Sequence, residues 1–226
     1  MEGVLLVDKP AGWTSFDVVN YVRKMVAQAE DKRPKQVKVG HTGTLDPFAT
    51  GLLVLLVGKE YTRRAGGLSK LDKTYEVTMQ LGETSSTGDP EGEITVVSDK
   101  KPTEKAIEET LRRFTGGIEQ VPPAFSAIKI NGKRAYKLAR EGKEVKLEPR
   151  KVIINRLELL SYSYPKVKFV ADVSSGTYIR SLVEDLGEAL GTGAYTAGLR
   201  RTQVGALHVQ AAKPVDKLQL DTDIKL

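Results

Sequence analysis

The segment from Tyr75 to Leu81, Tyr-Glu-Val-Thr-Met-Gln-Leu, alternates apolar and polar side chains. Successive side chains of a β-strand point to opposite faces, so this alternation predicts a strand with one buried and one more exposed face. Alternation and apolar runs predict further strands in both directions along the chain, bounded by glycine, proline and polar residues. These strands are expected at residues 3–7, 52–57, 93–97, 125–130, 152–161, 167–173 and 204–209, with a turn at 84–92.

Three other segments have the apolar spacing of amphipathic helices. The first begins at the capping-box pair Thr14 and Asp17, and the second begins near Thr103 and stops at the glycine pair 116–117. The third lies within 177–191, with a threonine cap at its start and a glycine at its end. Many strands, three spaced helices and no regular strand–helix alternation predict an α+β fold with a mixed, largely antiparallel sheet and flanking helices. No convincing domain boundary is visible, so we expect one domain over residues 1–226.

The composition excludes several classes of protein. With 40% hydrophobic and 28% charged residues, the chain of 226 residues is typical of a globular protein rather than a disordered tail. Cysteine is absent and His41 and His208 are the two histidines, so neither a disulfide framework nor a protein-built zinc centre is expected. The longest apolar run, 52–57, is too short to span a bilayer, and no signal-peptide core precedes Asp8. We therefore expect a soluble, cytoplasmic protein.

The net charge of +6 is concentrated in one segment. Residues 129–151 contain nine lysines and arginines and three glutamates, so the rest of the chain is balanced. A local basic block is typical of a surface that binds a polyanion, although on charge alone a solvated charged loop is the favoured explanation. The block lies between the strands predicted at 125–130 and 152–161 and is therefore an insertion in the sheet.

A second segment surrounds one carboxylate with glycines and a proline. Residues 40–51 read Gly-His-Thr-Gly-Thr-Leu-Asp-Pro-Phe-Ala-Thr-Gly. Pro47 restricts Asp46 to extended backbone, and the glycines allow a ligand to approach the main chain. Because Asp46 is the only acid here, no local carboxylate pair for glycoside hydrolysis is visible, and a Ser-His-Asp relay lacks its elbow motif. From these residues alone, an Asp-Pro turn explains Asp46 and ordinary hydrogen bonding explains His41.

This segment resembles the signature of the TruB family of tRNA pseudouridine synthases, in the form His41-Thr42-Gly43-x-Leu45-Asp46-Pro47-x-Ala49-x-Gly51. Further stretches agree in order and spacing, and the match covers residues 3 to 215, approximately. They are Asp8-Lys9-Pro10-x-Gly12-x-Thr14-Ser15, Lys73-x-Tyr75, Pro122-Pro123-x-Phe125-Ser126-Ala127-x-Lys129-x-Asn131-Gly132-Lys133-Arg134-Ala135-Tyr136, Gly176-Thr177-Tyr178-Ile179-Arg180 and Leu199-Arg200-Arg201.

The resemblance implies the pseudouridine synthase fold and a specific reaction. Such enzymes break the N1–C1′ bond of the T-loop uridine at conventional tRNA position 55, turn the uracil and rejoin it through C5. The product has the same atoms as the substrate, so no cofactor is expected. The resemblance makes Asp46 the catalytic carboxylate, with its role as nucleophile or base left open. It implies that Arg180 pairs with Asp46, which favours the charged carboxylate, and that Tyr75 stacks on the flipped base.

The same resemblance implies how the RNA is held. His41 fills the space of the extruded nucleotide, and Tyr178 and Leu199 line the pocket, although core packing also explains such residues. The basic insertion, at about 126–151, corresponds to a thumb that closes over the T-arm, where its bases contact phosphates. Its expected substrate-binding residues are Lys129, Lys133 and Arg134. The implied partner is tRNA, with no metal, membrane or protein partner, and we expect a monomer.

One departure from the family pattern concerns the C-terminus. Many bacterial members carry a PUA-type domain there, whereas this chain ends soon after Leu218, so we expect no such domain. The missing module also disfavours a guide-RNA-dependent, dyskerin-like synthase, which remains the alternative among enzymes. A second alternative is a tRNA-binding or tRNA-folding module without catalysis, and intact Asp46, Tyr75 and Arg180 disfavour it.

Overall fold

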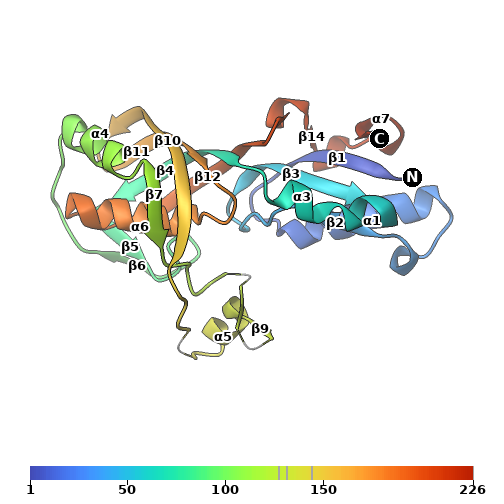
Figure 1. Ribbon diagram of the computed structural model, residues 1–226, viewed down its shortest axis with the longest axis horizontal. Coiled ribbons are helices and arrows are strands. Elements are labelled where there is room, and N and C mark those ends of the chain that lie inside the picture. The colour runs from blue at the N-terminus through green and yellow to red at the C-terminus, as the bar shows by residue number, and fades with distance from the viewer. Residues whose placement is uncertain (127, 131, 144, 226) are drawn as a thin grey trace. The chain divides into compact units, whose positions relative to one another are not determined.

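The computed structural model describes residues 1–126, 128–130, 132–143 and 145–225 (Figure 1). The chain forms two compact units. Unit 1 comprises Met1–Glu76 and Leu199–Leu226, and unit 2 comprises Val77–Gly198. Strands β4 (Lys73–Leu81) and β12 (Ala194–Val204) contribute residues to both units. The predicted α+β class with a mixed, largely antiparallel sheet is confirmed.

Unit 1 is built on a sheet in the order β14-β1-β3-β12. The central strand β3 is buried along almost its whole length, as its apolar run predicted, and pairs antiparallel with β1, with Leu55 opposite Leu5. It pairs parallel with β12, where Gly51 lies opposite Arg201. The strands are β1 (Gly3–Lys9), β2 (Val39–His41), β3 (Thr50–Val57), β13 (Leu207–His208), β14 (Lys213–Pro214) and β15 (Ile224–Lys225).

Helix α1 (Ser15–Ala29) covers this sheet with the apolar face that its sequence predicted. Val18, Val22 and Val26 are buried, and the capping box between Thr14 and Asp17 is present. The hydrogen bonds from Thr14 lower the pKa of the Asp17 carboxyl. The shorter helices of the unit are η1 (Pro34–Gln36), α2 (Lys59–Arg63), α3 (Ala65–Ser69), η2 (Val209–Ala211), η3 (Val215–Lys217) and α7 (Leu220–Asp223).

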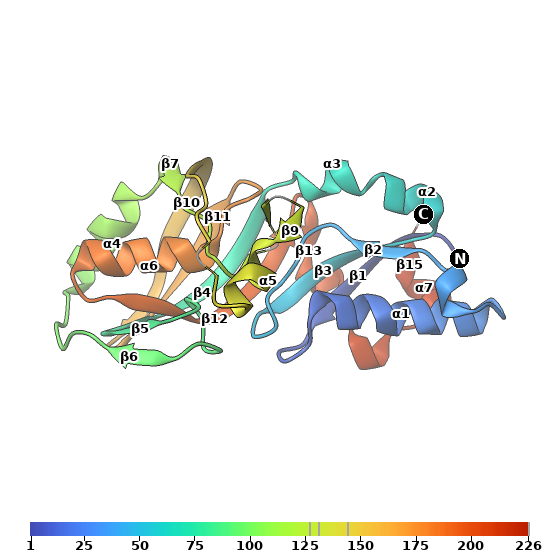
Figure 2. The same ribbon diagram turned by 90° about the horizontal axis from the view of Figure 1, so that it is seen from below.

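Unit 2 contains the strand order β12-β4-β11-β10-β7 and two main helices. Strands β10 and β11 pair antiparallel with Leu157 opposite Ala171, and α4 contacts both β10 and α6 (Figure 2). A separate hairpin is formed by β5 and β6. The elements are β5 (Glu83–Ser85), β6 (Ile94–Val96), α4 (Glu104–Arg113), β7 (Gly116–Gln120), β10 (Arg150–Ser163), β11 (Lys166–Val173) and α6 (Ile179–Leu190).

The basic insertion leaves the sheet of unit 2 after β7 and returns at β10. These strands pair antiparallel with Gln120 opposite Arg150, so the insertion starts and ends at neighbouring positions. It contains the small hairpin of β8 (Lys129–Ile130) and β9 (Lys133–Arg134), followed by α5 (Ala135–Arg140). Figure 1 shows α5 and β9 projecting away from the sheet. Positions 127, 131 and 144 of the expected thumb lie outside the described residues.

Two predicted strands are wrong in extent. Among the described residues of the strand predicted at 125–130, Lys129–Ile130 form a strand and 125, 126 and 128 do not, and the strand that precedes the insertion is β7. The sequence Gly-Gly-Ile-Glu-Gln of β7 has low strand propensity, and pairing with β10 makes it a strand. The strand predicted at 204–209 is instead the end of β12, a turn at Gly205 and the short β13.

The caps of the remaining helices agree with the sequence in two of three cases. Thr103 caps α4 by accepting a hydrogen bond from the amide of Ala106, and Gly191 ends α6 in the left-handed conformation. Thr177 is not a helix cap. Its hydroxyl donates to the carbonyl of Ser174 (2.9 Å), and α6 begins at Ile179 with no side-chain cap.

Candidate active site

Asp46 lies in the segment between β2 and β3, residues 42–49, which we term the Asp46 loop. The amide of Thr42 donates to the carbonyl of Val54 (3.1 Å), and the amide of Ala49 donates to the carbonyl of Asp46 (3.1 Å). Leu45 and Ala49 are buried, whereas Asp46 is half-buried. The loop therefore folds tightly around anchoring apolar side chains and leaves its carboxylate partly accessible.

The beginning of α1 holds the loop on both sides of Asp46. The buried hydroxyl of Ser15 donates to the carbonyl of Leu45 (3.0 Å) and accepts from the amide of Leu45 (2.8 Å). On the other side, the amide of Gly12 donates to the carbonyl of Pro47 (2.9 Å). Both neighbours of the catalytic candidate are thus fixed by groups near the first turn of one helix.

Lys9, the last residue of β1, reaches the same loop. Its side chain is fully buried, and its ammonium donates to the carbonyls of Pro10 (2.9 Å), Trp13 (2.6 Å) and Pro47 (3.2 Å). A buried cation needs such partners because it has lost its hydration. The resemblance includes Lys9 in a motif but assigns it no role, and the structure shows that it ties β1 to the Asp46 loop.

Arg201 on β12 connects the start of the loop to β3, the strand that follows it. It is 2% exposed, and its guanidinium donates to the carbonyls of Leu52 (2.7 Å), Gly43 (3.0 Å) and Thr44 (3.5 Å). A Cβ on Gly51, which has φ +100°, would lie 2.3 Å from the Arg201 carbonyl oxygen. Gly51 therefore permits the close approach of two strands, whereas the sequence suggested close approach of a ligand. Sequence reasoning gave Arg201 no role.

Lys73 places a second cation near Arg201. Its ammonium donates to the carbonyls of Ser69 (2.7 Å) and Leu71 (2.5 Å). Burial, together with the charge of Arg201, lowers the pKa of Lys73 to about 8. A Cβ on Gly43 would lie 3.5 Å from the Arg201 Nη1 atom and 4.0 Å from the Lys73 Cε atom. The side chains of two cationic residues therefore lie beside the start of the Asp46 loop, at Gly43.

The other expected site residues of unit 1 are distributed over three strands. His41 is the last residue of β2 and leads directly into the Asp46 loop. Tyr75 is buried on β4, on the same face as Val77, and Leu199 is half-buried on β12. The roles that the resemblance gives these three residues stay predictions.

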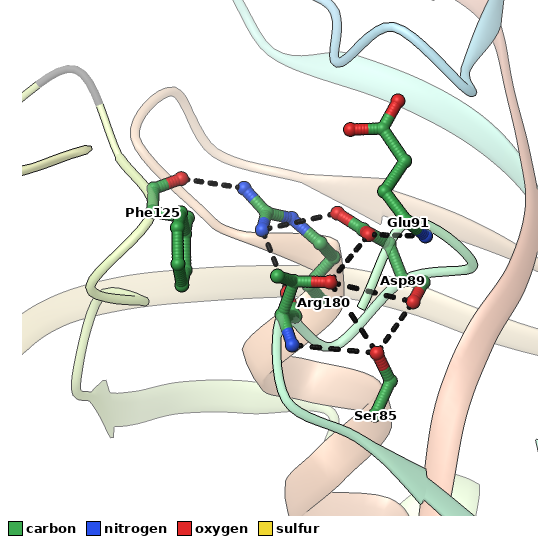
Figure 3. A network of polar contacts seen from close by, with 6 residues as sticks. Ser85, Asp89, Glu91, Phe125 and Arg180 are labelled. Carbon is green, nitrogen blue, oxygen red and sulfur yellow. Dashed lines mark hydrogen bonds and ion pairs between the residues drawn. The ribbon is translucent and has the colours of Figure 1, made fainter. Parts of the chain in front are cut away.

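In unit 2, Arg180 is the second residue of α6 and forms a buried ion pair with Asp89 (Figure 3). The Nη1 and Oδ2 atoms are 3.3 Å apart, and each side chain is 5% exposed. The guanidinium also donates to the carbonyls of Thr87 (2.8 Å) and Phe125 (2.8 Å). Additional hydrogen bonds of this kind are what allow a buried ion pair to be tolerated. The expected pairing of Arg180 with Asp46 joins residues of the two units and stays a prediction.

Asp89 is itself held in place by the turn that contains it. Its Oδ1 atom accepts from the hydroxyl of Thr87 (2.6 Å) and the amide of Glu91 (3.0 Å), and its carbonyl accepts from Ser85 (2.5 Å). Sequence reasoning recognised a turn at Gly88-Asp89-Pro90 but not this function. Burial raises the pKa of the neighbouring Glu184, with Arg180 acting in the opposite direction.

Tyr178 is held by a residue that the sequence did not indicate. Gln120, at the end of β7, donates to the carbonyl of Tyr178 (3.0 Å) and accepts from its amide (2.8 Å). One position after Gln120, the carbonyl of Val121 accepts a hydrogen bond from the hydroxyl of Ser181 on α6 (2.9 Å). The beginning of α6, with Tyr178 and Arg180, is thus tied to the point where the basic insertion starts.

The expected RNA-binding residues of the insertion lie on its small hairpin. Lys133 and Arg134 are exposed on β9, and Arg134 is opposite Lys129 on β8. The side chain of Lys129 lies outside the part of the molecule that the structure describes. Lys143 is paired with Glu141 (2.6 Å), and this contact lowers the pKa of the Glu141 carboxyl.

Within residues 1–126, 128–130, 132–143 and 145–225, no group of three or more histidine, aspartate or glutamate side chains is arranged to hold a metal ion. No helix in these ranges is long and apolar enough to cross a membrane.

Comparison with protein families gives two adjoining matches. Residues 31–179 match the model described as TruB family pseudouridylate synthase (N terminal domain). Residues 180–222 match the model described as tRNA pseudouridylate synthase B C-terminal domain. Together the matches include Asp46, Tyr75, Arg180 and Leu199, and the first alone covers more than half of the chain.

Individual relatives agree with these matches. A protein of Phocaeicola vulgatus named tRNA pseudouridine synthase B is 45% identical over 214 residues, covering 94% of this chain and 90% of the relative. A protein of the same name from Burkholderia lata is 48% identical over 221 residues, covering 96% of this chain and 65% of the relative.

Solved structures are more distant. A chain of a Cbf5-Nop10-Gar1 complex matches 96% of this chain with 28% identity and a TM-score of 0.71. A chain of an H/ACA RNP bound to a substrate RNA containing 2′-deoxyuridine matches with 27% identity and a TM-score of 0.68. This chain spans about half the length of each, 53% and 52%.

Proposed function

Because the chain belongs to the TruB family of pseudouridylate synthases, we propose that it isomerises the T-loop uridine at conventional position 55 of tRNA to pseudouridine. The observation that carries this proposal is the identity of 45% along nine-tenths of a relative named tRNA pseudouridine synthase B. The partly accessible Asp46, on a loop held from several sides, supports it. The chain is thus an enzyme of tRNA modification.

The reaction needs one ionised carboxylate in a fixed position. The target base leaves the T-loop stack, the N1–C1′ bond breaks, and the uracil turns and forms a C5–C1′ bond. N1 gains a proton and C5 loses one, so the atoms balance without a cofactor. Asp46 acts on the sugar or its C1′ atom, and hydrogen bonds from Lys9, Ser15 and Arg201 keep its loop from moving. Such preorganisation lowers the entropic cost of reaching the transition state.

The remaining residues hold the flipped nucleotide. Tyr75 stacks on the base, Tyr178 and Leu199 line the pocket, and His41 occupies the vacated space in the RNA. Arg180 pairs with the catalytic carboxylate. The contacts of Arg180 with Asp89, Thr87 and Phe125 support this role, because they fix the direction of its guanidinium.

The basic insertion binds the tRNA backbone. Lys129, Lys133 and Arg134 contact phosphates of the T-arm, which positions the RNA without reading its sequence. The exposure of Lys133 and Arg134, on a hairpin that projects from unit 2, supports this role. Acting as the thumb, the insertion of about residues 126–151 closes over the T-arm.

The enzyme acts on tRNA directly, as a cytoplasmic monomer without a guide RNA or protein partner. The H/ACA-type structures provide the alternative, but they are only 27–28% identical to this chain. The tRNA synthases are markedly more similar, at 45–48%. The guide-dependent alternative is therefore not favoured.

Tritium release tests the proposal. Purified protein is incubated with unmodified tRNA labelled with tritium at uridine C5, because forming the C5–C1′ bond releases that label. Release without added RNA or protein is expected. Release only with a guide RNA would support the H/ACA-like alternative, and tRNA binding with no release would support a non-catalytic module. Gel filtration with light scattering measures the molar mass in solution and so tests whether the protein is a monomer.

A further inference from the structure

Phe16, the second residue of α1, is an unusual side chain for its position. It is 61% exposed. In the described part of unit 1, the other large apolar side chain that is exposed is that of the terminal Met1. The buried face of α1 is formed mainly by valines, with Ser15 and Ala27, and does not include Phe16. Packing of the helix therefore does not explain an aromatic ring in water, and exposed aromatic residues commonly mark binding sites.

A guanidinium lies over this ring. Arg23 is seven residues further along α1, on the same face, and its Cζ atom is 5.9 Å from the centroid of the Phe16 ring. Two hydrogen bonds hold Arg23, from Nη1 to the Oδ1 atom of Asn20 (2.6 Å) and from Nη2 to the carbonyl of Val39 (3.3 Å). Among the described residues, no carboxylate forms an ion pair with it. We term Phe16, Asn20 and Arg23 the α1 strip.

The strip adjoins the Asp46 loop through short connections. Ser15, the neighbour of Phe16, exchanges two hydrogen bonds with the backbone of Leu45, next to Asp46. At its other end, Arg23 bonds to Val39 of β2, the strand that ends at His41. An aromatic ring and an uncompensated positive charge are therefore presented beside the loop that carries the catalytic carboxylate.

We infer that the α1 strip binds one unpaired base of the substrate RNA, close in sequence to the target uridine. The base stacks on Phe16, and Arg23 attracts the phosphate of the same nucleotide. An aromatic face with an adjacent guanidinium is the usual platform for unpaired nucleotides. A protein partner would need a broader apolar surface, but the flanking Thr14 and Asp17 are polar and exposed. The inference rests on the proposed function, because it takes the tRNA T-arm as the ligand.

The first test measures the Kd of unmodified tRNA by filter binding, in the Asp46→Asn background so that no turnover occurs. Phe16→Ala and Phe16→Leu are expected to weaken binding by about 5- to 100-fold, the range for loss of one stacked base. Phe16→Tyr keeps an aromatic ring and is expected to retain the Kd of the protein with Phe16. Arg23→Gln lowers the slope of log Kd against log salt by about one. Leu160→Ala, at a side chain 53% exposed on β10, is the matched control and leaves the Kd unchanged.

The second test identifies the base through coupling. A T-arm hairpin RNA carries an abasic site at one loop position at a time, excluding the target. At the position whose base stacks on Phe16, the abasic site raises the Kd for the protein that retains Phe16. The same abasic site has little effect on the Kd for the Phe16→Ala variant. Such non-additivity is the mark of a direct contact.

Two results would overturn the inference. One is an unchanged Kd for Phe16→Ala, which would leave the strip for some other ligand. The other is a weakened Kd with no abasic position coupled to Phe16, which would mean that the substitution acts through the fold. Thermal melting of each variant shows whether the fold is intact. Neither result affects the proposed function, which instead fails if the unsubstituted protein releases no tritium.

Discussion

The Asp46 loop and the basic insertion both connect neighbouring strands, but they use their cations in opposite ways. In the loop, Lys9 and Arg201 are buried and donate to backbone carbonyls. In the insertion, Lys133 and Arg134 are exposed on a two-residue strand. A buried cation defines geometry, because it must keep its hydrogen-bond partners, whereas an exposed cation acts at a distance and is screened by salt.

This difference separates catalysis from affinity. A loop held at several points keeps a carboxylate in one position, which lowers the barrier of a chemical step. A surface charge attracts a polyanion but does not position any particular atom of it. Substitutions in the loop should therefore change rate and stability, and substitutions in the insertion should change tRNA affinity and its dependence on salt.

The largest expected effect is that of Asp46→Asn. The amide can act neither as a nucleophile nor as a base, so single-turnover tritium release should fall by at least about a thousandfold while the Kd for tRNA stays within about twofold. Asp216→Asn, at an exposed position in η3, is the matched control and should retain full activity. Retained activity in Asp46→Asn would show that the catalytic assignment is wrong.

Arg201→Met should have the next largest effect. It leaves the carbonyl of the buried Leu52, and those of Gly43 and Thr44, without their donor, and a buried group without a hydrogen bond costs about 1–3 kcal/mol. We expect the free energy of unfolding to fall by about 3 kcal/mol in urea titrations, and the single-turnover rate to fall more than tRNA affinity. Arg112→Met, at an exposed site on α4, should change neither quantity. An equal loss of rate and affinity would contradict a positioning role for Arg201.

The double substitution Lys133→Gln with Arg134→Gln should weaken tRNA binding without changing stability. Each phosphate contact contributes about 0.7–0.9 to the slope of log Kd against log salt, so the loss of two contacts should lower the slope by about 1.4–1.8. The unfolding free energy should be unchanged, because both side chains are exposed. An unchanged slope would remove the basic insertion from the RNA interface. Lys166→Gln with Lys168→Gln, exposed on β11, serves as the control pair.

The smallest expected effect is a dependence of stability on pH from Lys73. Its pKa is about 8 in the folded chain and 10.5 in the unfolded chain, so the unfolded chain binds more protons between these values. Unfolding free energy should therefore rise as pH increases from about 8 to 10.5, by about 1–2 kcal/mol after solvent screening. The rise should be absent in Lys73→Met. Identical pH profiles for the two proteins would show that Lys73 is not perturbed by its neighbours.

Local sequence features predicted the parts of the site that depend on near neighbours. Glycines and a proline around Asp46 indicated a tight loop, and the spacing of Thr14 and Asp17 indicated the start of α1. The resemblance to a known family then supplied the reaction. The extent of β7 was missed because pairing with β10, and not local propensity, determines it. The uncapped start of α6 was missed because the Thr177 hydroxyl bonds to Ser174, and Gln120, 58 residues away along the chain, holds the backbone of Tyr178.

The partners of the buried cations could not be predicted in this way. Arg201 and Gly43 are 158 residues apart along the chain, and Arg180 and Thr87 are 93 residues apart. Neither Asp89 nor Gln120 belongs to a motif that indicates its partner. A long-range contact of this kind depends on sheet order and register, so no local pattern in the sequence announces it.

The sequence by itself determined the chemical identity of the site: one carboxylate in a stiff loop, a basic insertion for a polyanion, and a family resemblance that names the reaction. Only the tertiary structure decided which cations are structural and which are available to a ligand. Burial converts Lys9 and Arg201 into supports of the Asp46 loop, because a desolvated charge must be satisfied by nearby carbonyls. Exposure leaves Lys133 and Arg134 available to phosphate on their hairpin, and partial exposure leaves Arg23, which no carboxylate pairs with among the described residues, beside the ring of Phe16.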